Sequence, residues 1–290
     1  MDFITTFING LSLGGIYAMI ALGYTMVYGI AKMLNFAHGD IIMVGGYTIL
    51  VVLNLCGNPI LATIAAIVLC VVLGVVVEKL AYKPLRGASN LAVLITAIGV
   101  SYLLQSLAQI IFGSASKMVN IANLGVLQVG SIKIQGYTLF TLICTIVVMI
   151  ALTLFIRYTK LGKAMLAVSE DRGAAQLMGI NANRIITITF IIGSALAAVA
   201  GLCTLMKAPS INSTFGAMPG IKAFTAAVIG GIGSIPGAML GGILLGVVES
   251  ISNKITVIAP YTDAIEFGIL IVILLIRPTG ILGKKRREKV

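Results

Sequence analysis

Long apolar runs follow one another along almost the whole chain. Runs such as "LATIAAIVLCVVLGVVV" (61–77) are continuously apolar, whereas strands of outer-membrane barrels alternate apolar and polar residues in short segments. A helix needs about 20 apolar residues to cross a bilayer. The pattern therefore predicts an all-α integral membrane protein with about eight transmembrane helices and one or two discontinuous segments. The expected spans are 8–31, 41–56, 59–81, 91–112, 137–156, 185–206, an interrupted 222–252, and 262–276.

Two polar interruptions stand out between apolar runs: "NFAHGD" (35–40) and "GGIGSIPG" (230–237). Irregular backbone at membrane depth is tolerated only where it is buried in protein or lines a watery cavity. Two such breaks, one in each half, are typical of transporters built from two repeats. The second break has two interpretations that remain open, a discontinuous helix beside a transport path and a tight hairpin at the membrane surface. The residues concerned are Gly230, Gly231, Gly233 and Ser234.

The first interruption holds the single histidine of the chain, His38, together with Asn35 and Asp40. Ionisable residues inside a membrane are often functional, so these three residues are candidates for a translocation path. For His38 a structural role is favoured over a proton relay or a substrate contact. In that role the histidine is hydrogen-bonded to helix ends and holds the break in shape.

The composition agrees with a membrane protein. Of the 290 residues, 59% are hydrophobic and 10% are charged, and the mean hydropathy is +1.10, whereas about a quarter of the residues in soluble domains are charged. Residues 1–290 are expected to form a single transmembrane domain. Apart from His38 and Asp40, few ionisable residues are expected deep in the spans, and Glu249 is assigned to a helix end. No catalytic pair of residues and no metal site are expected.

The net charge of +11 is explained by basic cytoplasmic loops, and no nucleic-acid partner is expected. This rule places residues 83–90, the loop 157–184 and the tail "KKRREK" (284–289) inside. It places 113–136 and 207–221 outside, because the first carries only two lysines.

The loop 157–184 contains a predicted short helix at 170–178. Ser169 is the expected cap, Glu170 and Asp171 occupy the first turn beside the positive helix end, and Gly179 ends the helix. The helix rests on the lipid surface or docks into a partner protein. Its small apolar face favours docking. The candidate docking residues are Glu170, Asp171, Arg172, Ala174, Ala175, Leu177, Met178 and Gly179.

Several motifs, in order along nearly the full chain, resemble the branched-chain amino-acid ABC transporter permease family, most closely the H-type subunit of the Liv system. They are "GLSLGGIYAMIALGYTMVYGIAKMLNFAHGD" (10–40), "AYKPLRG" (81–87), "LITAIGVSYLLQ" (94–105), "EDRGAAQLMGIN" (170–181), "MPGIKAFTAAVIGGIGSIPGAMLGGILLG" (218–246) and "RPTGILG" (277–283). The loop "GAAQLMG" (173–179) also looks like the E-A-A-x-x-x-G loop of bacterial ABC importer permeases, with Gly173 in place of the glutamate.

The resemblance implies a multi-pass permease domain of the bacterial inner membrane, with a coupling loop at 157–184. It implies import of leucine, isoleucine or valine beside a second related permease, two cytoplasmic ATPase subunits and an external substrate-binding protein. The chain has no G-x-x-x-x-G-K-[ST] phosphate loop, so we expect no cofactor on it and ATP on the partner subunits. Two alternatives remain, the same architecture importing urea, amides or other amino acids, and a secondary transporter that acts alone.

Overall fold

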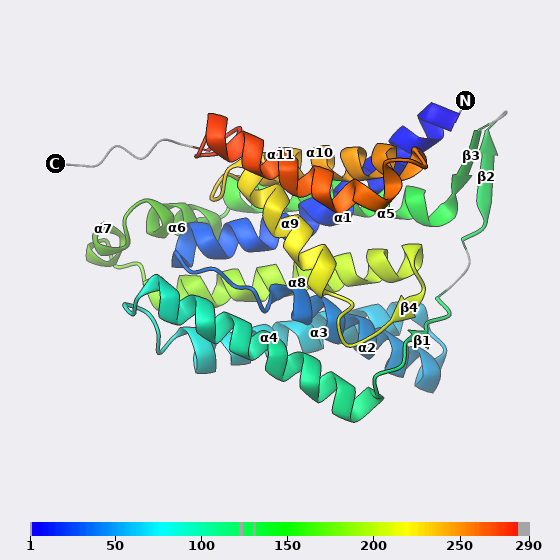
Figure 1. Cartoon of the computed structure of the whole chain (residues 1–290). Helices are drawn as coiled ribbons and strands as arrows, with labels where there is room; N and C mark the ends of the chain where they lie inside the picture. The colour runs from blue at the N-terminus through cyan, green and yellow to red at the C-terminus, as the bar shows by residue number, and fades with distance from the viewer. Residues whose placement is uncertain (1, 122–123, 130–131, 284–290) are drawn as a thin grey trace.

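The computed structural model describes residues 2–121, 124–129 and 132–283, and it shows an elongated bundle of helices (Figure 1). Eight of the described helices are long and apolar enough to cross a membrane, which confirms the predicted all-α class and helix number. The basic tail at 284–289 lies outside the described residues.

The long helices begin and end close to the predicted spans. They are α1 (Asp2–Ala31), α2 (His38–Cys56), α3 (Pro59–Val77), α4 (Asn90–Phe112), α5 (Gly136–Tyr158), α8 (Ala182–Lys207), α10 (Ile235–Lys254) and α11 (Thr262–Ile276). The π-helix η1 (Glu78–Tyr82) continues α3, and the 3-10 helix η2 (Ala259–Tyr261) precedes α11. The shorter helices are α6 (Lys160–Glu170), α7 (Arg172–Leu177) and α9 (Ala217–Gly230).

The two ends of the bundle differ in structure. One end carries α6 and α7, and we call it the α7 end; the other carries four short strands, and we call it the strand end (Figure 1). Strand β1 (Lys117–Met118) pairs antiparallel with β4 (Ser210–Ile211), with Lys117 opposite Ile211. Strand β2 (Val126–Val129) pairs antiparallel with β3 (Ile132–Gln135), with Val126 opposite Gln135.

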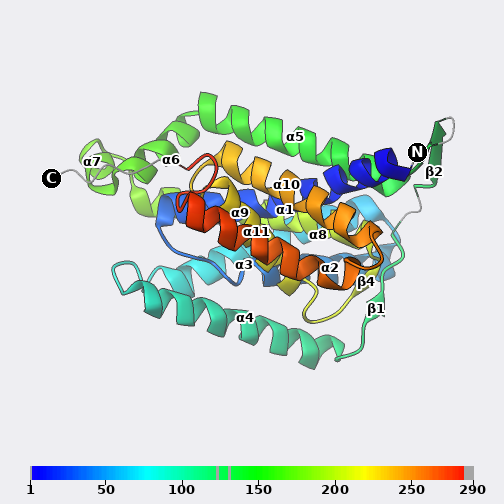
Figure 2. The ribbon, with the colours of Figure 1, turned by 45° about the horizontal axis from the view of Figure 1, so that its top comes forward.

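Helices α1 and α8 form the centre of the bundle, and most of their residues are buried. Small residues let the helices approach closely. A Cβ atom at Gly10 would lie 2.9 Å from the backbone of Val247 in α10. Helices α4 and α5 lie at opposite edges (Figure 2), and few residues of α4 and α11 are buried. These exposed faces are apolar enough for lipid or for another membrane subunit.

Helices α2 and α9 begin in the middle of the bundle (Figure 1). The extended segment 32–37 returns from the α7 end after α1, and the segment 208–216 returns from the strand end after α8. The two helix starts touch, because a Cβ atom at Gly220 would lie 3.1 Å from the Cα atom of Gly39. With 14 residues, α9 is about 21 Å long, which is shorter than the roughly 30 Å of a bilayer core.

The predicted interruption at 230–237 is a hairpin between α9 and α10. Gly231 and Gly233 have φ angles of +108° and +93°, and the Ser234 side chain caps α10 by accepting a hydrogen bond from the Gly237 amide at 3.2 Å. The C-terminal segment covers the turn, because the amide of Leu282 donates to the Gly230 carbonyl at 2.9 Å. The stretch therefore forms a tight turn between two helices, of which α9 is short. A second irregular segment of the second half, 208–216, leads from α8 back to the start of α9 in the middle of the bundle (Figure 1).

The predicted helix at 170–178 is wrong at its start. The eleven-residue α6 runs through Ser169 to Glu170, because Gly162, Met165 and Val168 form a buried stripe at helical spacing. Asp171 then caps α7, and its side chain accepts from the Ala174 amide at 3.0 Å. The predicted stop is confirmed, since Gly179 has a φ angle of +81°.

Candidate functional site

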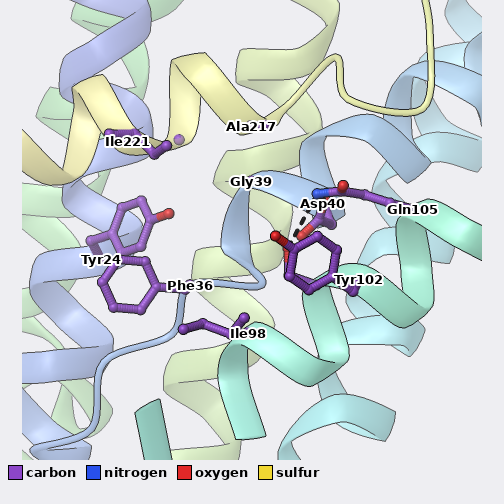
Figure 3. Close-up of a pocket in the computed structure, with 11 residues that line it drawn as sticks. Tyr24, Phe36, Gly39, Asp40, Ile98, Tyr102, Gln105, Ala217 and Ile221 are labelled. Carbon is purple, nitrogen blue, oxygen red and sulfur yellow. Dashed lines mark hydrogen bonds between the residues drawn. The ribbon is translucent and has the colours of Figure 1, made fainter. Parts of the chain in front are cut away.

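A cavity of about 280 Å³ lies where α2 and α9 begin. Figure 3 shows its wall, which combines the first turns of these two helices with side chains from α1, the 32–37 segment and α4. The lining residues are Tyr24, Phe36, Gly39, Asp40, Ile98, Ser101, Tyr102, Gln105, Ala217, Gly220 and Ile221.

One side of the cavity is polar. Asp40 is only 2% exposed and lies in the first turn of α2, where a carboxylate complements the positive helix end. The side-chain amide of Gln105 donates to Asp40 Oδ1 at 2.9 Å and to Ser101 Oγ at 3.2 Å. These bonds fix the carboxylate at the cavity wall and leave it further capacity to accept hydrogen bonds.

The opposite side is mostly apolar and is formed by Tyr24, Phe36 and Ile221 (Figure 3). Phe36 and Tyr24 both pack against Phe224, with ring centroids 5.3 and 5.8 Å apart. On the α4 side the wall is open, because Tyr102 is 66% exposed. The cavity therefore places a carboxylate opposite an aromatic and aliphatic surface and opens beside α4.

The two helix starts at the cavity have no side-chain cap. The N-cap residues are Ala37 for α2 and Gly216 for α9, whereas Asn58, Asn181 and Ser234 cap α3, α8 and α10. Among the described helices α5 and α11 also lack such a cap, but they begin at the strand end. Uncapped helix starts carry positive partial charge and attract anionic groups.

The structure brings the predicted residues of the first break together, and each has a different environment. Asp40 lines the cavity, while Asn35 is buried beside it and accepts a hydrogen bond from Tyr82 Oη at 2.8 Å. The glycines and Ser234 of the second predicted break are not among the residues that line it.

His38 is the first residue of α2 and is 1% exposed. Its ring meets Tyr24 edge to face, with centroids 4.8 Å apart, and lies between Gly23 of α1 and Gly193 of α8. Its Nε2 atom has no hydrogen-bond partner within the described residues. At this atom the predicted hydrogen bond to a helix end is absent, and packing in a glycine-lined space holds the ring.

The candidate docking residues gather around α7, beyond the membrane-spanning helices (Figure 1). Ala175 is buried, with 4% exposure, and anchors the short helix. Leu177 and Met178 are 91% and 82% exposed. Two large apolar side chains so exposed make α7 a candidate interaction surface.

Sequence reasoning missed a group of charged residues between α9, α10 and α11, which we call the lysine cluster; all but Asp263, whose side chain is 55% exposed, are largely buried. Lys222 Nζ of α9 lies 3.1 Å from Glu249 Oε2 of α10, and 2.8 and 3.2 Å from Asp263 Oδ1 and Glu266 Oε2 of α11. The Tyr17 hydroxyl of α1 donates to Glu249 Oε2 at 2.6 Å. The signal was weak, because Lys222 and Glu266 stand at the first and fifth positions of predicted spans, where each resembles a charge near a helix end.

Comparisons with known proteins agree with this architecture. The chain is 45% identical to the high-affinity branched-chain amino acid transport system permease protein BraD of Pseudomonas aeruginosa, over 98% of this chain and 96% of that protein. It is 43% identical to the corresponding protein LivH of Escherichia coli K12, over 99% and 98%. The structure of PsaBC from Streptococcus pneumoniae in complex with Fab has a TM-score of 0.51 at 16% identity, over 96% of this chain and 93% of that chain. This last similarity concerns the fold alone.

Residues 6–274 match the family described as "Branched-chain amino acid transport system / permease component". This match confirms the predicted transport subunit, which is not an enzyme, and the multi-pass location in the inner membrane. A permease component works with the other components of its transport system. The chain belongs to the branched-chain amino acid permease family.

Proposed function

We propose that this chain carries leucine, isoleucine and valine across the bacterial inner membrane as one permease of an ATP-driven importer. The substrate passes through the cavity at the starts of α2 and α9. The observation that carries this proposal is the meeting of two uncapped helix starts, those of α2 and of the short α9, at a cavity with one carboxylate and an apolar wall. Discontinuous helices at the midplane are a recurring way to hold a small substrate in transporters.

The chemistry of the wall suits an apolar amino acid. The substrate ammonium group pairs with Asp40, and its carboxylate faces the positive starts of α2 and α9. The aliphatic side chain packs against Phe36 and Ile221. The volume of about 280 Å³ is near the lower end of ligand pockets, roughly 300 Å³, and fits a small cargo.

The open side beside α4 is where we place the second, related permease. Tyr102 is 66% exposed there although it also lines the cavity. A second subunit on this side closes the path and covers the phenol. We place the external substrate-binding protein at the strand end, which is opposite to the basic loops (Figure 1).

The two ATPase subunits dock at the α7 end, with Leu177 and Met178 as apolar anchors. Glu170, Arg172 and their neighbours form the polar rim, which orients the partner more than it strengthens binding. ATP is bound and hydrolysed on those subunits, and this chain needs no cofactor of its own.

Asp40→Asn tests the proposed path. The amide oxygen still accepts from Gln105, so the permease is expected to fold and assemble. The lost charge is expected to raise the KM for leucine uptake about tenfold or more, since a hydrogen bond to a charged group contributes about 1.5–3 kcal/mol. Uptake of labelled leucine into vesicles that contain the whole transporter and its binding protein measures this.

Competition by unlabelled compounds in the same assay tests the cargo. Isoleucine and valine are expected to inhibit leucine uptake, and urea and acetamide are not. An unchanged KM in the Asp40→Asn variant contradicts the path through this cavity. Inhibition by urea or acetamide contradicts the branched-chain cargo.

A further inference from the structure

A continuous series of polar contacts leads from α7 into the bundle. Arg172, the first residue of α7, donates through Nη2 to Asn183 Oδ1 at 3.1 Å. Arg86, in the connection between η1 and α4, donates through Nη1 to the same oxygen at 2.5 Å. Asn183 in the first turn of α8 therefore joins α7 to the η1–α4 connection.

The next contact is buried. Arg86 Nη2 is hydrogen-bonded and ion-paired to Glu78 Oε1, and the Glu78 side chain is fully buried. Thr187 of α8 donates to the other oxygen, Glu78 Oε2, at 3.0 Å. Buried ion pairs add little net stability, but removing one partner is costly. The pair fixes the position of η1 relative to α8.

The last contact reaches Asn35, which precedes the cavity-lining Phe36 in the chain. Glu78 and Tyr82 are the first and last residues of the π-helix η1, and the Tyr82 hydroxyl donates to Asn35 Oδ1 at 2.8 Å. The main-chain carbonyl of Asn35 accepts a hydrogen bond from the main-chain amide of His38, the first residue of α2. Four residues separate Asn35 from Asp40 in the chain.

The π-helix is the unusual element of this series. π-helical turns are rare, occur as local expansions of α-helices and are frequent at functional sites. If α3 continued as a regular α-helix, the side chains of Glu78 and Tyr82 would point in different directions relative to each other than they do in the π-helix. If η1 changed to a regular α-helical turn while Glu78 stayed in place, Tyr82 would move, and such a change would give the series an element with two arrangements.

We propose that these contacts form a relay that transmits the movement of α7 to the cavity. The relay consists of Arg172, Asn183, Arg86, Glu78, Tyr82 and Asn35. These are positioning residues, and η1 is the joint that converts a displacement at the α7 end into a displacement of Asn35 and the start of α2. This inference rests on the proposed docking of the ATPase at α7 and adds the internal route.

Tyr82→Phe removes only the hydroxyl that contacts Asn35, and Tyr47→Phe is a matched control. Tyr47 is also a buried tyrosine, but its hydroxyl has no hydrogen-bond partner within the described residues. In purified whole transporters in liposomes, Tyr82→Phe is expected to keep ATP hydrolysis within about twofold. Leucine transported per ATP is expected to fall about fivefold or more, the effect of one buried hydrogen bond. Tyr47→Phe is expected to change neither quantity.

Asn183 allows a second test at an exposed position. Asn183→Ala removes the oxygen that joins the two arginines and is expected to lower leucine transported per ATP. Asn183→Asp keeps an acceptor and is expected to restore it. A merely structural role predicts lower amounts of complex with an unchanged ratio of transport to hydrolysis, and that result overturns the relay.

The relay and the docking surface fail in different ways. If Leu177→Asp releases the ATPase while Tyr82→Phe and Asn183→Ala remain fully coupled, docking at α7 stands and the relay is wrong. If Leu177→Asp leaves ATPase binding and leucine transport unchanged, the docking proposal is wrong. The relay is then wrong as well, because it depends on docking at α7.

Discussion

Replacing Leu177 by aspartate is expected to abolish leucine uptake while the membrane helices still fold. Leu177 is 91% exposed, so its replacement removes no internal contact of the permease. If the side chain fills a groove of the ATPase, the variant buries a carboxylate without a partner, and such burial is costly. Binding of the ATPase is expected to weaken about 30-fold or more, because a lost anchor residue costs roughly 2 kcal/mol or more.

Ala174→Glu is expected to act in the same way, because this exposed alanine lies in the same short helix. Gln176→Glu is the matched control, since it adds a charge at an exposed polar position in α7. Pull-down of the ATPase by detergent-solubilised permease measures binding, and uptake of labelled leucine measures transport. Normal binding and transport in both Leu177→Asp and Ala174→Glu would remove α7 from the mechanism.

Lys222→Met is expected to prevent the bundle from folding stably, and Glu266→Gln is expected to be tolerated. Within the described residues, Lys222 makes ion pairs with three carboxylates. The side chains of Glu249 and Glu266 are 12% and 0% exposed. Lys207 also acts electrostatically on Glu249, beyond ion-pair distance. Without Lys222, buried negative charges face each other, and loss of a buried partner costs about 3–5 kcal/mol.

Glu266→Gln has the opposite effect on the charge balance. It removes one of the three negative charges around a single ammonium group and keeps a side chain of the same size. The yield of monodisperse permease and its unfolding temperature in detergent measure both effects. Equal loss in the two variants would show that the cluster stabilises the bundle through its shape or hydrogen bonds and not through its charge balance.

The spans could be predicted from the sequence because the apolar runs that form them are continuous and local. The second break could not. The segment "APSINSTFG" (208–216) reads as an ordinary external connection, while the glycine-rich stretch at 230–237 gives a stronger signal for broken helix. Only the contact of Gly39 with Gly220 across the bundle shows which segment re-enters.

The candidate site was predictable in part for a similar reason. Asp40 and Asn35 lie in one short polar stretch, so the sequence places them together. Gln105 and Ile221 reach the same cavity from α4 and α9, and no local pattern joins these helices. The lysine cluster depends in the same way on charged residues of three helices, α9, α10 and α11, and each charge alone resembles one near a helix end.

The α7 region shows how local competition shifts a boundary. Ser169 and Asp171 are both good caps, and the sequence alone favours the first because acidic residues follow it. The buried stripe of α6, which ends at Val168, carries that helix past Ser169. Packing therefore decides which cap is used.

The most direct test of the central claim compares two single cysteines in the assembled transporter, in a background without Cys56, Cys70, Cys144 and Cys203. Ser101→Cys lies at the cavity, and Ser234→Cys lies in the α9–α10 hairpin. With the binding protein present, we expect a small aqueous thiol reagent to label Ser101→Cys. Leucine is expected to slow the labelling of Ser101→Cys and to leave the labelling of Ser234→Cys unchanged. Protection of Ser234→Cys by leucine, with Ser101→Cys inert or unprotected, would contradict a path between the starts of α2 and α9.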